Sequence, residues 1–70
     1  MTPMMNIERL RSKRGWSRRE LASRAGITEK TIQNLEGGDK RKVQLRIREG
    51  LERALEVPAS RLWNAEGQAK

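Results

Sequence analysis

Two short stretches of helical pattern, separated by a tripeptide at positions 26–28, constrain the fold of this chain more than any other feature. Ser17 precedes the first stretch and Thr28 the second, and a hydroxyl at such a position accepts a hydrogen bond from a backbone N–H of the first helical turn. Gly26 and Gly37 follow the two stretches, where a glycine allows the chain to leave the helix. The pattern therefore predicts two short helices joined by a three-residue turn.

The remaining sequence also predicts helices. Apolar residues recur at spacings of three and four from Ile7 onward, and no segment alternates β-branched or aromatic residues with polar ones. We therefore expect an all-α fold of five short helices. The first, fourth and fifth are expected at residues 7–14, 43–56 and 59–63. Gly50 lies inside the fourth, where it costs about 1 kcal/mol relative to Ala unless a close contact requires it.

The chain is long enough for one domain, which we expect at residues 7–63 between flexible ends at 1–6 and 64–70. It lacks Cys, His and Tyr, and with them the usual thiolate ligands, the commonest general base and the strongest nucleophile. No phosphate-binding glycine loop or metal-ligand cluster is evident. We therefore expect a protein that is not an enzyme and has no cofactor, metal or small-molecule ligand.

The charge is strongly basic and unevenly distributed. Sixteen Lys and Arg against nine Asp and Glu give a net charge of +7. Residues 1–42 hold eleven of the basic and five of the acidic residues, so the positive charge belongs mainly to the first half. Such asymmetry favours an anionic partner, above all nucleic acid. Because no apolar segment has the length of a signal peptide or a membrane helix, we expect a cytoplasmic protein without membrane association.

The two central helices have the spacing of a helix-turn-helix unit. In that unit one helix lies across the DNA backbone, and the second places its N-terminal residues in the major groove. Similar corners also occur in helical bundles that bind nothing, so the pattern alone leaves a purely structural corner open. The basic residues around it favour DNA binding.

Several spaced elements match a known family in order: Glu20-Leu21-Ala22, the turn at 26–28, Ile32, and Glu36 with Gly38. With these elements the chain resembles the lambda repressor and Cro family of phage-type (Xre-like) regulators, over residues 7–63. The resemblance implies a lambda repressor-like helix-turn-helix bundle that binds double-stranded DNA. It further implies a Cro-like transcriptional repressor in the nucleoid of a bacterial or phage-infected cell, acting as a homodimer on a palindromic operator.

The resemblance also implies roles for individual residues. The base-reading positions are Arg18, Glu29, Lys30 and Asn34. The phosphate-contacting positions are Arg11, Ser17, Arg19, Thr31, Lys40, Arg41 and Lys42. Arg11 and Glu36 match an ion pair that ties the first helix to the end of the recognition helix, with two solvated surface charges as the alternative. The dimer contact positions are Pro58, Ala59, Arg61, Leu62 and Trp63.

Three alternatives stay open at this point. Glu29 could read cytosine or orient Lys30, or it could simply complement the dipole of its helix. Leu62 and Trp63 could belong to the core of the monomer instead of a dimer interface. The chain could also be a protein-interaction module of the antitoxin type that binds DNA through the same helices. RNA binding is less favoured, because the exposed aromatic residues that stack on single-stranded bases are lacking.

Overall fold

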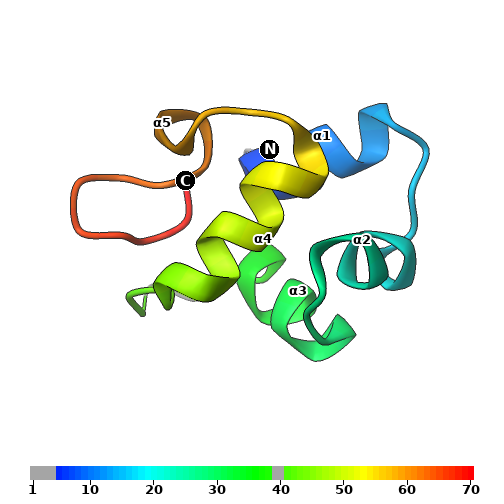
Figure 1. The fold of residues 1–70 in the computed structure, drawn as a ribbon, viewed down its shortest axis with the longest axis horizontal. Helices are drawn as coiled ribbons and strands as arrows, with labels where there is room; N and C mark the ends of the chain where they lie inside the picture. The colour runs from blue at the N-terminus through cyan, green and yellow to red at the C-terminus, as the bar shows by residue number, and fades with distance from the viewer. Residues whose placement is uncertain (1–4, 39–40) are drawn as a thin grey trace.

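The computed structural model describes residues 5–38 and 41–70. It shows five helices, α1 (Asn6–Lys13), α2 (Arg18–Ala25), α3 (Glu29–Glu36), α4 (Leu45–Leu55) and α5 (Ala59–Leu62) (Figure 1). Within these residues the only β pairing is an isolated bridge between Trp63 and Ala69. The prediction of an all-α fold with five short helices is confirmed. No helix in the described part of the chain is both long and apolar enough to cross a membrane.

Local contacts determine where α2 and α3 begin and how they are joined. The hydroxyl of Ser17 accepts a hydrogen bond from the backbone N–H of Glu20 at 3.1 Å. The hydroxyl of Thr28 does the same for Thr31 at 3.2 Å. Gly26 ends α2 with a φ of 71°, a left-handed conformation that glycine adopts without strain. These contacts stop one helix and start the next within three residues, as the sequence predicted.

The core is formed by one side of every helix. α2 packs against both α3 and α4, while α1 contacts α3 and α5, and α4 contacts α5. The buried apolar residues are Ile7, Leu21, Ala22, Ile32, Leu35, Val43, Leu51, Leu55, Leu62 and Trp63. Burial of these side chains is the main source of stability for such a small domain. Val43 belongs to this core although α4 begins only at Leu45, two residues later than the sequence predicted.

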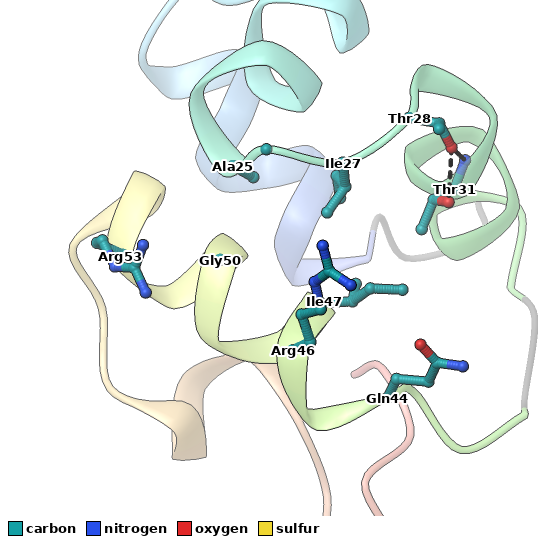
Figure 2. Close-up of a pocket in the computed structure, with 10 residues that line it drawn as sticks. Ala25, Ile27, Thr28, Thr31, Gln44, Arg46, Ile47, Gly50 and Arg53 are labelled. Carbon is teal, nitrogen blue, oxygen red and sulfur yellow. Dashed lines mark hydrogen bonds between the residues drawn. The ribbon is translucent and has the colours of Figure 1, made fainter.

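Gly50 lies where α4 passes the end of α2 (Figure 2). A Cβ atom at this position would lie 2.5 Å from the carbonyl oxygen of Ala25, far closer than the 3.4–4 Å of an ordinary contact. The glycine therefore allows the two helices to approach each other. This is the close contact that justifies its place inside a helix.

The C-terminal segment differs from the flexible tail predicted for residues 64–70. The side-chain oxygen of Asn64 accepts hydrogen bonds from the backbone of Glu66 and Gln68, which closes a tight loop. The backbone N–H of Val43 donates to Gly67 at 3.0 Å, and that of Asn6 donates to Lys70 at 2.9 Å. The segment thus folds back onto the start of α1 and the approach to α4.

The predicted flexible N-terminus also differs in part. Residues 1–4 lie outside the described part of the chain, but Asn6 is already the first residue of α1. Its side-chain amide donates to the carbonyl oxygen of Arg61 at 2.6 Å. Asn6 and Lys70 therefore both lie close to α5, whereas α3 lies at the lower edge of the view in Figure 1.

Candidate nucleic-acid interface

The surface of α3 divides into a buried side and an outward side. Ile32, Leu35 and Glu36 are buried, whereas Lys30 and Asn34 are exposed. Because Lys30 and Asn34 are four residues apart, they lie one above the other on the same face of the helix. Glu29 is exposed at the first position of α3, where its charge is favourable to the helix dipole.

Two hollows flank this outward face. The first, about 510 Å³ in volume, is lined by Arg18, Gln33, Asn34, Gly37 and Gly38. The second, about 290 Å³, includes Thr31, Asn34, Arg41, Lys42 and Gln44 in its lining. Asn34 lines both hollows. The fold thus brings Arg18 and Asn34 together on one side of α3, and Thr31, Arg41 and Lys42 on the other.

The other predicted contact residues lie around these hollows. Ser17 and Arg19 are exposed at the start of α2, although the Ser17 hydroxyl is already engaged as a helix cap. Glu29 and Lys30 line neither hollow. Lys40 lies outside the described residues.

A single carboxylate, that of Glu36, joins α1, α2 and α3. Its oxygens accept hydrogen bonds from Nε of Arg11 at 2.7 Å and from Nη2 of Arg11 at 3.0 Å. Nε of Arg18 donates to the same carboxylate at 2.9 Å. The Glu36 side chain is 1% exposed, compared with 14% for Arg11 and 43% for Arg18. The ion pair expected between Arg11 and Glu36 is therefore present, and it includes a third member that the sequence did not indicate.

The electrostatics of this cluster follow from its geometry. Burial opposes ionisation of Glu36, but the hydrogen bonds and the positive charges of Arg11 and Arg18 together outweigh burial, so the pKa of the Glu36 carboxyl lies below its ordinary value. The hydrogen bond to Glu36 correspondingly raises the pKa of Arg11, although burial opposes it. The cluster holds two cations and one anion and keeps a net charge of +1 next to α3.

Three residues near this surface were not singled out from the sequence. Gln33 lines the hollow with Arg18, and Gln44 lines the hollow with Arg41. Arg46 lines a third hollow of about 370 Å³, which lies between the turn at 26–28 and α4, and Gln44 is part of that lining too (Figure 2). Gln33 follows Glu29 by four residues, and that spacing on an exposed helix face could have identified it. Gln44 and Arg46 depend on how α4 packs, which the local sequence does not reveal.

The predicted dimer contacts divide into two groups. Pro58, Ala59 and Arg61 are exposed, but Leu62 is fully buried and Trp63 is 4% exposed. The indole Nε1–H of Trp63 donates to a carboxylate oxygen of Glu52 at 2.7 Å. Leu62 and Trp63 therefore belong to the core of the chain itself, which corrects the interface role expected for them.

The described residues contain no cluster of three or more His, Cys, Asp or Glu side chains that could hold a metal ion. What the surface does offer is hydrogen-bond donors: amides and cations on and beside the outward face of α3. These groups suit the acceptor atoms of base edges and phosphates.

The fold and this surface define the class of the protein. α2 and α3, joined by the turn that begins at Gly26, form a helix-turn-helix unit, the unit that presents its second helix to the major groove of DNA. A family model described as a helix-turn-helix domain matches residues 5–67. The chain therefore belongs to this family of helix-turn-helix domains. A search of curated proteins returned no match.

Proposed function

We propose that the chain is a sequence-specific transcriptional repressor that reads the major groove of double-stranded DNA with α3. The outward face of α3 carries the proposal, because Lys30 and Asn34 are exposed on a helix whose opposite side is buried. Lys can donate to O6 and N7 of guanine, and Asn can form two hydrogen bonds with adenine. The resemblance to the lambda repressor and Cro family supports the same role.

Affinity would come mainly from contacts with the DNA backbone. Arg41 and Lys42 are exposed beside α3, and they line the same hollow as Thr31 and Asn34. Cations in this position neutralise phosphates and release counterions, which makes binding strongly dependent on salt. Sequence preference and affinity are therefore expected to reside in different residues.

The repressor would act as a homodimer on a palindromic operator. Two copies related by a two-fold axis place their recognition helices about 34–36 Å apart, one turn of the DNA helix. Of the predicted contact residues, Pro58, Ala59 and Arg61 would form the dimer surface, since they are exposed.

Selection from a random pool of duplexes tests this proposal, followed by titration of the selected duplex, a random duplex, single-stranded DNA and RNA at two salt concentrations. We expect a palindromic site, with the selected duplex bound most tightly at both salt concentrations. A selected site without an internal repeat would contradict the dimer. Equal affinity for all four nucleic acids would contradict sequence-specific recognition.

A further inference from the structure

The two arginines that share Glu36 use their donors differently. Each nitrogen of the Arg11 guanidinium has a partner, because Nε and Nη2 contact Glu36 and Nη1 donates to the backbone oxygen of Trp16 at 2.8 Å. Arg18 contacts Glu36 through Nε alone, and its side chain is 43% exposed. Among the described residues, none accepts a hydrogen bond from its two Nη groups. Glu36 thus fixes the base of the Arg18 guanidinium while both Nη groups stay accessible.

The surroundings of Arg18 favour a base edge as the ligand. The hollow of about 510 Å³ that Arg18 lines contains two amide side chains, those of Gln33 and Asn34. The other described residues of its lining are Gly37 and Gly38, which present no side chain that would block an approaching base. Among the residues that the structure describes, Arg18 is the only cation in this lining, whereas the hollow on the other side of α3 gathers both Arg41 and Lys42. One guanidinium beside amides is the combination that reads base edges.

We infer, on the basis of the proposed function, that Glu36 is a positioning residue for sequence recognition. It holds Arg18 through Nε so that the two Nη groups point at O6 and N7 of one guanine, while Gln33 reads the adjacent base pair from the same hollow. A free arginine side chain loses considerable rotamer freedom when it binds, and a side chain that is already anchored loses less. The anchored guanidinium therefore discriminates guanine better than an unanchored one.

The inference is tested by selecting the bound sequences from a random pool of duplexes. The selection is carried out with five forms of the full chain: the unchanged chain, Arg18→Ala, Arg18→Lys, Glu36→Gln and the control Glu20→Gln. Glu20 pairs with Arg24 on the exposed side of α2 at 3.2 Å, so the control makes the same change of charge away from the hollow. The folded fraction of each form is measured by circular dichroism at the selection temperature.

We expect the unchanged chain and Glu20→Gln to select guanine at one position of each half-site. Arg18→Ala should reduce that preference about 5- to 150-fold, the range of one two-pronged contact. Glu36→Gln should reduce the preference at the same position by a smaller factor, without changing the other positions. Gln33→Ala, selected in parallel, should change the preference only at the neighbouring base pair.

A purely structural role for Glu36 would lower the affinity for all duplexes equally, and that result would overturn the inference. Uniform loss with Arg18→Ala would do the same, because it would mean that Arg18 contacts phosphate. If Glu36→Gln does not fold, Arg18→Lys decides. Lysine has a single ammonium group, which cannot be held by Glu36 at one nitrogen while two other nitrogens donate to guanine, so the guanine preference should fall although lysine itself can contact guanine. An unchanged guanine preference in Arg18→Lys would overturn the inference. Failure of the unchanged chain to select any sequence would instead refute the proposed function.

Discussion

Two opposite effects on the free energy of unfolding are expected when Gly50 in α4 is replaced by alanine. In an exposed helix this substitution stabilises by about 1 kcal/mol, because alanine is the better helix former. In this fold the new Cβ would lie 2.5 Å from the carbonyl oxygen of Ala25, about 0.9 Å short of the 3.4 Å at which ordinary contact begins. Since the atom met is backbone, no change of rotamer can relieve the clash. α2 and α4 must therefore move apart, which disturbs the packing of the buried Leu21 and Ala22 on α2 and Leu51 on α4.

Overpacking of this kind costs about 1–3 kcal/mol. A clash with backbone lies near the upper end of that range, and the better helix propensity of alanine offsets about 1 kcal/mol of it. We therefore expect the free energy of unfolding to fall by about 1–2 kcal/mol. For a domain of this size, that loss lowers the melting temperature by about 4–16 °C.

Urea unfolding followed by circular dichroism measures the effect. Glu49→Ala and Glu49→Gly provide the control, because Glu49 is exposed on the same helix and the difference between them gives the propensity of alanine over glycine there. If Gly50→Ala raises the free energy of unfolding by as much as that difference, the close approach of α2 and α4 is refuted.

Three further predictions follow from the fold and the site. Glu36→Gln should lower the free energy of unfolding by about 3 kcal/mol at pH 7. Because the pKa of Glu36 is lowered in the folded state, the stability that its charge contributes is complete above the ordinary pKa of 4.5 and is lost as the pH falls through the folded pKa. Urea unfolding at pH 7 and pH 3 should therefore show a smaller loss of stability in acid for the variant than for the unchanged chain. Gly67→Ala should lower stability by about 1–2 kcal/mol, because φ at this buried glycine is 79°, whereas an unchanged melting temperature would indicate that residues 64–70 are flexible after all. In a salt titration, Lys30→Ala and Asn34→Ala should lose the preference for the selected duplex over a random duplex. Arg41→Ala should weaken binding to the two duplexes equally and reduce the slope of log affinity against log salt concentration by about 1. Equal losses of affinity for the two duplexes in all three variants would contradict this division of roles.

The parts of the fold that the sequence predicts depend on local contacts. A cap such as Thr28 acts on the third residue after it, and a left-handed glycine such as Gly26 acts within its own turn. Both signals lie within a few neighbouring residues, so the helix-turn-helix unit could be located from the sequence alone. The outward stripe of Lys30 and Asn34 follows equally from helical spacing.

The features that the sequence did not predict are contacts between residues far apart in the chain. Arg18 reaches Glu36 across 18 positions, and Val43 donates to Gly67 across 24. No local pattern encodes such contacts, because they depend on how the helices pack. Leu62 and Trp63 show a related difficulty: an apolar residue near the end of a small domain fits a core and an interface equally well, and only the packing decides between them.

The hydrogen bond between Asn6 and Lys70 has a consequence for how the protein is made. Synthesis proceeds from the N-terminus at about 5–20 residues per second, so α1 leaves the ribosome several seconds before residue 70 does. During that interval α1 lacks both its backbone partner at Lys70 and the carbonyl of Arg61 that the Asn6 side chain contacts. Completion of the native fold therefore waits for release of the last residues of this sequence, and a nascent chain stalled before them would hold α1 less firmly than the finished protein does.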